Sequence, residues 1–334
     1  MNLLKFLLIF ANILLLYKVV LVTNLFSPER QMADFDNYYR TVPDIKKGIN
    51  PYTVSYMQTL GPPITFVYYY PYSLFSLATA QVIFLVTNII CGFATCIVLS
   101  KKHWLFLSVI LWLSFLSRYS LQIGQPSLTI AFLISLVLKN KFTHLAATGL
   151  VLIKAFLGFS LFSLKNFIPL FLVLILSLVI IKPAWTSYYL INKVGANFGR
   201  FQNATLISYE NQTMLNTLAR IGLANIYPVM WIVILLIGIY SVRKYHDFSL
   251  GILFSFILTP VLWQHYLVAL FPIFIMSFQK KLSWSNVVSF LLWWPDLRLN
   301  FLNPFTAVLA SHFYVSILLL TISFLWSPKS SSSH

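Results

Sequence analysis

Acidic residues are scarce in this chain. Only seven of its 334 residues are Asp or Glu, and charged residues of both signs make up 9% of the sequence. Soluble domains carry about a quarter charged residues, so this composition excludes an ordinary soluble protein. Cysteine is almost absent as well, with Cys91 and Cys96 as the two examples. They lie five positions apart in one expected helix and point in different directions, so they predict neither a disulfide nor a metal site.

Long apolar runs make up most of the sequence. Hydrophobic residues make up 59% of the chain, the mean hydropathy is +0.82, and runs such as FLVLILSLVII recur from end to end. These runs lack the alternation of a membrane β-barrel strand. The sequence therefore predicts an all-α polytopic membrane protein. Residues 3–23 are nearly a full span without a cleavage site, so they are expected as a retained first helix.

Basic residues in short polar breaks predict the topology, because the positive-inside rule places such breaks in the cytoplasm. The breaks hold Lys5, Lys101, Lys102, His103, Lys139, Lys141, Lys165, Arg243, Lys244, Lys280 and Lys281. Turns on the outer side between these breaks give about twelve helices, in a range of ten to thirteen. The expected helices are 3–23, 80–100, 104–117, 128–139, 144–154, 156–165, 168–184, 226–242, 249–262, 264–278, 284–295 and 305–327.

Several of these helices are shorter than the ~20 residues of a full span, so neighbouring helices or a cavity must shield them. Residues 65–78 are rich in Tyr and contain Pro71, which is typical of an interfacial or re-entrant helix. Two longer outer loops are expected at 24–63 and 185–225. Neither is long enough for an independent soluble domain, and no internal repeat is present. Residues 1–334 are therefore predicted to form one integral membrane domain.

Polar residues that interrupt the apolar segments fall almost entirely on the predicted outer side. They are Asp34, Asp36, Gly124, Gln125, Lys154, Asn211, Gln212, Arg220 and His265. Six of the seven acids also fall outside, which leaves Asp247 on the cytoplasmic side. These residues are separate from the basic breaks that define the topology. Their convergence on one face therefore predicts an active cavity there.

Asp34 and Asp36 allow three interpretations. In an extended loop they would face the same side and could chelate a divalent ion or bind a sugar. On a helix they would diverge, and only one could face a substrate. The simplest interpretation is a pair of solvated loop acids. Because Tyr38 and Tyr39 follow and membrane segments flank the loop, a functional role for at least one acid is favoured over that interpretation.

Three other polar positions are candidates for ligand binding, and two of them, Lys154 and His265, keep structural interpretations as well. Lys154 interrupts an apolar run with no acid nearby, so its ammonium must snorkel to the interface, pair with a distant acid or bind an anionic ligand. His265 could hydrogen-bond a backbone carbonyl, or it could orient a carboxylate or contact a phosphate. Arg220 follows Gln212 by eight residues, so the two could share a helix face, and Arg suits bidentate phosphate recognition.

Sequence elements along most of the chain resemble those of one family. They are D-F-x-x-Y-Y at Asp34, Phe35, Tyr38 and Tyr39; G-x-x-P-Y at Gly48, Pro51 and Tyr52; Y-P-Y-S at Tyr70, Pro71, Tyr72 and Ser73; G-Q at Gly124 and Gln125; the intramembrane Lys154; N-Q-T and arginine at Asn211, Gln212, Thr213 and Arg220; and P-x-x-W-x-H at Pro260, Trp263 and His265. In this order the chain resembles the GT-C fold polytopic glycosyltransferases of family 87, which includes polyprenyl-phosphate-mannose-dependent mannosyltransferases of mycobacterial envelopes. This chain departs from the family at two places. The second proline of the family's Y-P-P-L is missing, and so is the proline that usually follows the intramembrane lysine by a few residues.

The resemblance implies a GT-C-like bundle and an inverting hexosyl transfer, most often of mannose, from a polyprenyl-phosphate-linked donor to a hydroxyl of a lipid or glycan acceptor. The reaction would occur on the outer, periplasmic side of the cell membrane. The catalytic residues would be Asp34, as general base, and His265. The donor would be bound by Lys154, Arg220, Asn211, Gln212 and Gln125. The acceptor or sugar would contact Asp36, Tyr38, Tyr39 and Tyr52. No cofactor and no nucleic-acid partner are expected, and a divalent metal at Asp34 and Asp36 is a less favoured alternative.

Two other functional classes fit parts of the pattern. A transporter or flippase of a lipid-linked sugar would share the apolar bundle and isolated charges, but it would often show internal repeats and discontinuous helices. Another GT-C enzyme, such as a protein O-mannosyltransferase or an arabinosyltransferase, would keep Asp34 as base and change both substrates. Nucleotide-sugar chemistry would instead call for a cytoplasmic soluble domain.

Overall fold

The structure is a computed structural model of the chain. It describes residues 3–24, 32–53, 63–164, 168, 169, 171–173, 175, 182–188, 191, 212–259, 262–280, 282–295, 306 and 309–326. These residues form α-helices, 3-10 helices and turns, and no β-strand occurs among them. The all-α prediction is therefore confirmed for the described part of the chain.

The chain divides into two compact units. Unit 1 comprises residues 1–158, 166–205 and 265–272, and unit 2 comprises residues 159–165, 206–264 and 273–334. The helices of unit 1 are α1 (Leu3–Val22), α2 (Ala33–Lys46), α3 (Phe66–Tyr69), α4 (Leu77–Leu99), α5 (Trp104–Leu113), α6 (Phe115–Ile123), α7 (Ser127–Leu138), α8 (Thr143–Ile153) and α10 (Pro183–Tyr188). The helices of unit 2 are α12 (Met214–Arg220), α13 (Tyr227–Tyr245), α14 (Phe248–Leu258), α16 (Trp284–Trp293) and α18 (His312–Trp326), and most of α15 (Phe271–Lys280) belongs to it as well.

Several helices are apolar and long enough to cross a membrane. Among the described residues these are Leu3–Val22, Leu77–Leu99 and Ala224–Tyr245. The pair α5 and α6 would make a fourth span, although it is bent by 67°. Shorter apolar helices are α7, α8, α14 and α18. Membrane character is thus supported, and the expected count of about twelve spans stays a prediction.

Most expected helices that fall on described residues lie where the hydrophobic pattern puts them, with three differences. The predicted helix 104–117 is broken at Ser114, whose ψ of 129° interrupts the helical backbone. The predicted helix 156–165 is a 3-10 helix at Ala155–Ser163, and 264–278 begins as the 3-10 helix Gln264–Leu270 before α15. Residues 65–78 form short helical turns, with the 3-10 helix Tyr70–Leu74 between α3 and α4. Most of the expected helix 168–184 and of the loop 185–225 lies outside the described residues.

Polar side chains join the long helices within unit 1. Asn12 of α1 donates to the Leu105 carbonyl and accepts from the Ser108 hydroxyl, which ties α1 to α5. Asn88 of α4 accepts from both the backbone N–H and the hydroxyl of Thr129, in the first turn of α7. Because lipid offers no hydrogen bonds, such polar contacts stabilise a particular pairing of apolar helices.

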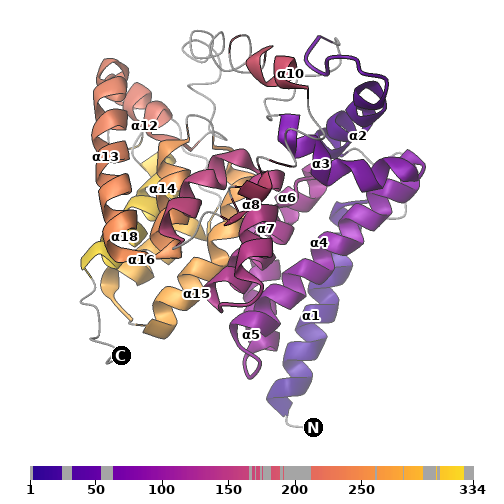
Figure 1. Cartoon of the computed structure of the whole chain (residues 1–334). Helices are drawn as coiled ribbons and strands as arrows, with labels where there is room; N and C mark the ends of the chain where they lie inside the picture. Colours follow the sequence, from indigo (N-terminus) through magenta and orange to yellow (C-terminus); the bar gives the residue numbers. More distant parts are fainter. Residues whose placement is uncertain are drawn as a thin grey trace. The chain divides into compact units, whose positions relative to one another are not determined.

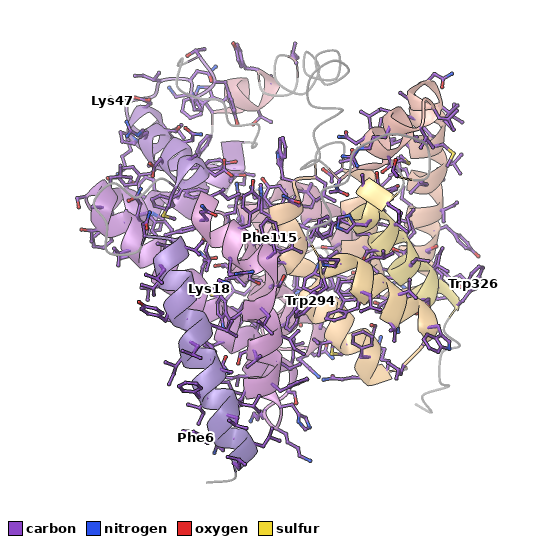
Figure 2. All side chains as sticks on the ribbon, turned by 180° about the vertical axis from the view of Figure 1, so that it is seen from behind. Phe6, Lys18, Lys47, Phe115, Trp294 and Trp326 are labelled. Carbon is purple, nitrogen blue, oxygen red and sulfur yellow. The ribbon has the colours of Figure 1, made fainter. Side chains whose placement is uncertain are left out.

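α2 lies at one end of unit 1 beside the start of α4, and the first turn of α7 meets α4 midway along it, at Asn88 (Figure 1). Since α4 and α7 both run away from this end, the turns that follow them lie at the other end. Those turns hold Lys101, Lys102, Lys139 and Lys141, and Figure 2 places Phe6 and Lys47 at opposite ends in the same way. Within unit 1 these basic turns and α2 therefore lie at different ends, and which end faces the cytoplasm stays a prediction.

Unit 2 is held together by helix caps and a hydroxyl pair. Asp247 caps α14 by accepting from the backbone of Ser249 and Leu250, and it lies 3.6 Å from the Lys280 ammonium. Ser289 of α16 and Ser316 of α18 each donate a hydroxyl hydrogen to the other's carbonyl. The Asp247–Lys280 contact joins two residues that the sequence assigns to the same, cytoplasmic side.

Candidate functional site

The helix α2 decides between the interpretations of the two acids that begin it. Asp34 and Asp36 both lie in its first turn, so their side chains diverge. A side-chain oxygen of Asp34 accepts from the Gln125 amide at 2.5 Å, and a side-chain oxygen of Asp36 accepts from the Gln81 amide of α4 at 2.7 Å. The two carboxylates therefore have different partners. No group of three or more metal-ligating side chains occurs in the described segments.

Gly124 brings Gln125 to Asp34. It ends α6 in the left-handed conformation, with a φ of +81°, which favours glycine. A Cβ atom at this position would lie 2.7 Å from the Phe35 Cβ and 3.0 Å from the Phe35 nitrogen. The backbone of the G-Q element thus packs directly on the start of α2. This close approach places the amide of Gln125, which is 2% exposed, beside the carboxylate.

Lys154 lies where α8 ends, and 6% of its surface is exposed. Its ammonium donates to the Tyr266 hydroxyl at 3.0 Å and lies 4.4 Å from the centre of the Tyr266 ring. The Tyr38 ring centre is 5.7 Å from the same nitrogen. A buried ammonium between two aromatic faces is stabilised without an acid in contact. Snorkelling to an interface therefore does not describe Lys154.

His265 contacts the ring of Tyr266, the residue to which Lys154 donates. Its ring centre is 4.3 Å from that of Tyr266 and 5.9 Å from that of Tyr119 on α6. The buried atoms His265 Nε2, Gln125 Oε1 and Tyr69 Oη have no hydrogen-bond partner among the residues that the structure describes. Buried polar atoms are nearly always paired, so these three are available to a polar ligand. We name Asp34, Gln125, Lys154, His265 and Tyr266 the polar cluster.

Burial raises the pKa of the Asp34 carboxyl above its usual value. The Gln125 hydrogen bond and the positive charge of Lys154 act in the opposite direction, since both favour the carboxylate. The pKa of Asp34 is raised overall, because the loss of hydration has a larger effect than the Gln125 hydrogen bond and the Lys154 charge together. A carboxylate with a raised pKa is a stronger proton acceptor than an ordinary aspartate.

Three tyrosines expected near the acceptor have structural contacts of their own. Tyr38 stacks on Tyr69, with ring centres 4.5 Å apart and planes 6° apart. Tyr39 donates its hydroxyl to the Phe75 carbonyl at 2.6 Å, and Tyr52 is 3% exposed. Tyr38 and Tyr52 thus pack α2 and the following loop against α3, and Tyr39 joins α2 to the residue that follows the 3-10 helix Tyr70–Leu74. Their proposed contact with a sugar stays a prediction.

Gln212 and Arg220 lie in unit 2 and meet at one carbonyl. The Gln212 amide donates to the Ala310 carbonyl at 3.0 Å, and Arg220 Nη1 donates to the same oxygen at 3.2 Å. Arg220 Nη1 also donates to the Ser311 hydroxyl at 2.7 Å. Gln212 precedes α12, so the two residues do not share a helix face as expected, and both side chains hold the segment before α18. Asn211 lies outside the described residues.

Three residues near the polar cluster were absent from the sequence-based expectation. Gln81 lies inside an apolar span and has no local motif, although a lone amide in such a span is itself a signal. Tyr266 follows His265 directly and could have been included with it. Tyr69 belongs to the run YYYPY, where nothing local separates one tyrosine from the next.

No model of a protein family matches the chain, and neither does any curated protein or solved structure.

Proposed function

We propose that the chain is an inverting glycosyltransferase of the membrane, with Asp34 as the general base. The sugar would come from a polyprenyl-phosphate donor and pass to a hydroxyl of a lipid or glycan acceptor. In this proposal the chain forms a GT-C-like bundle of about twelve spans, and the polar cluster faces the periplasm or exterior. The sugar is a hexose, with mannose as the first choice.

The observation that carries the proposal is the setting of the Asp34 carboxylate. It accepts from Gln125 at 2.5 Å, and the charge of the buried Lys154 acts on it. One cation, one amide and one carboxylate with a raised pKa form a combination suited to proton abstraction next to a developing negative charge.

The proposed step uses these groups as follows. Asp34 takes the proton of the acceptor hydroxyl as the acceptor oxygen attacks the anomeric carbon. The bond from that carbon to the phosphate oxygen breaks on the opposite face, and the electron pair leaves with the lipid phosphate. Lys154 and His265 are the cation and the hydrogen-bonding side chain that could stabilise the departing phosphate. The lipid product stays in the bilayer, which is consistent with an enzyme built of apolar helices.

The test is an assay of the purified chain with radiolabelled polyprenyl-phosphate sugars. Transfer or hydrolysis by the wild type, lost at least about a thousandfold in Asp34→Asn, would support the proposal. Asp44→Asn is the matched control, because it makes the same change ten positions later on α2. Near-normal turnover by Asp34→Asn would remove Asp34 from the base role. Movement of intact lipid across vesicles without bond cleavage would instead indicate a flippase.

A further inference from the structure

Arg118 is a partly buried cation of unit 1 that the proposed function does not use. It lies on α6, and its Nε atom is buried without a hydrogen-bond partner among the described residues. No carboxylate in the described segments lies within ion-pair distance of it. The sequence also places no Asp or Glu between residues 45 and 209. A partly buried guanidinium without an anion is costly in an apolar bundle.

Two serines lie beside this arginine at the start of α6. Ser114, the N-cap residue, precedes Ser117 by three positions and Arg118 by four, so it is a neighbour of both. Both serines are 0% exposed, and both hydroxyl oxygens lack a hydrogen-bond partner in the part of the chain that the structure describes. Two hydroxyl groups and the Nε–H of Arg118 are therefore without a partner near the first turn of α6.

The break between α5 and α6 adds backbone donors beside these side chains. Ser114 occupies the N-cap position of α6, yet its side chain makes no capping hydrogen bond. The first N–H groups of a helix have no partner within it, and they favour an anion. Helical side chains also lean toward the N-terminus of their helix, so Arg118 reaches back over the turn that begins at Ser114. A cation at a helix N-terminus is repelled unless an anion lies between them.

The break lies inside unit 1 and not at either end of it. Figure 2 places Phe115, the first residue of α6, between the levels of Lys47 and Phe6. The two helices meet at 67° there. Half-helices that start within a membrane often direct their N-termini at an anionic ligand.

We propose that Ser114, Ser117, Arg118 and the first N–H groups of α6 bind a phosphate group. Three sources of that group share this chemistry: a polyprenyl phosphate, a phospholipid headgroup and inorganic phosphate. Arg118 supplies paired N–H donors to the phosphate oxygens, and the two serine hydroxyls donate to the same group. This site is separate from the Gln125–Asp34 pair, and phosphate binding there does not require sugar transfer.

The test measures binding to the purified full-length chain in detergent, without any sugar. The probes are farnesyl phosphate, inorganic phosphate and nanodiscs containing phosphatidylglycerol. Farnesol is the control without a phosphate, and nanodiscs of phosphatidylcholine alone are the zwitterionic control without net charge. Thermal unfolding followed by tryptophan fluorescence reports binding as a rise in Tm. We expect at least one phosphate probe to stabilise the wild type, and the probe that does so identifies the source.

Arg118→Gln should weaken that binding by about ten- to a hundredfold. Arg243→Gln, an exposed arginine at the end of α13, is the matched control and should leave it unchanged. If Arg118→Gln does not fold, Arg118→Lys and Ser117→Ala decide, and each should weaken binding by several-fold. Equal affinity in wild type and in the folded Arg118 and Ser117 variants would overturn the proposal, as would a wild type that no phosphate probe stabilises. If Asp34→Asn loses sugar transfer but binds phosphate as the wild type does, the phosphate site at Arg118 is supported independently of the proposed function.

Discussion

The amide of Gln125 and the carboxylate of Asp34 are joined by a hydrogen bond of 2.5 Å, although 91 positions separate the two residues in the chain. The bond links the turn before α7 to the first turn of α2. Because the amide donates to the ionised carboxylate, it lowers the pKa of Asp34 against the upward effect of burial. The pair therefore determines the pH range in which Asp34 can accept a proton.

The first prediction concerns the pH dependence of transfer. Activity should rise with pH as Asp34 loses its proton, because a general base works only when ionised. Gln125→Leu removes the donor that favours the carboxylate, so the rising limb of the profile should move to higher pH. Gln81→Leu is the control, since Gln81 donates to Asp36 and not to Asp34. An unchanged limb in Gln125→Leu would show that another group controls it.

The second prediction concerns stability and follows from the raised pKa of Asp34. Between the ordinary carboxyl pKa and the raised one, the folded chain holds more protons than the unfolded chain, so stability falls as pH rises through that interval. Above it, the wild type carries the full cost of an ionised buried carboxylate. Asp34→Asn should thus be more stable than the wild type at neutral pH. The difference in unfolding free energy between Asp34→Asn and the wild type should shrink as the pH is lowered. A difference that stays constant from pH 3 to 7 would contradict a raised pKa at Asp34.

The third prediction compares two glycines with nearly the same backbone conformation. Gly124 and Gly222 have φ values of +81° and +77°. Alanine at either position should cost about 1 kcal/mol from the left-handed backbone. At Gly124 the new Cβ atom also overlaps Phe35 and approaches Met32, whereas at Gly222 nothing lies within 4 Å. Gly124→Ala should therefore destabilise by about 1–3 kcal/mol more. Equal unfolding midpoints for the two variants would rule out a tight α2–α6 contact.

The fourth prediction separates the two contacts of Lys154 with Tyr266. Tyr266→Phe removes the hydroxyl that accepts from the ammonium but keeps the ring beneath it, so it should cost about 0.5–1.5 kcal/mol. Tyr266→Leu removes the ring as well and should cost about 0.5–2 kcal/mol more. The measurement is thermal unfolding in one detergent at one pH. Identical losses for the two variants would mean that the ring face contributes nothing.

The fifth prediction concerns Arg220, which the family resemblance assigns to the donor phosphate. Its Nη1 atom donates to Ala310 and Ser311 in unit 2, so Arg220→Ala should lower stability by about 1–3 kcal/mol. A double-mutant cycle with Ser311→Ala should show a coupling of about 0.5–3 kcal/mol. A raised donor KM without any loss of stability would favour the phosphate role over the structural one.

Helices were predictable from this sequence where the apolar period is long. The expected helices 3–23 and 80–100 correspond to α1 and α4 within a few residues. The break at Ser114 was not predictable, because the surrounding segment LWLSFLSR (residues 111–118) contains neither Pro nor Gly and is largely apolar. The length of such a run indicates a helix but carries no information about a change of direction within it.

The sequence allowed the individual residues of the candidate site to be predicted, but not which of them contact one another. Asp34, Gln125, Lys154 and His265 were all selected because a polar group in an apolar context is costly. That argument gives no partner, so it could not pair Gln125 with Asp34 or Lys154 with Tyr266. It also failed to mark Arg118, which a purely local view treats as one more basic residue beside an interface.

The length of α4 has a consequence for how substrates would meet the polar cluster. Its 23 residues measure about 34 Å, slightly more than the ~30 Å hydrocarbon layer. Gln81, which donates to Asp36, is the fifth residue of that helix, so in a chain whose α4 crosses the bilayer the acids of α2 would lie at the level of the lipid headgroups. A phosphate carried on a lipid chain is held at the same depth by its own tail. Under the proposed function, bilayer thickness would set how well the depth of Asp34 matches that of a lipid-borne reactant, so thicker or thinner membranes should change the reaction rate without any change of side chain.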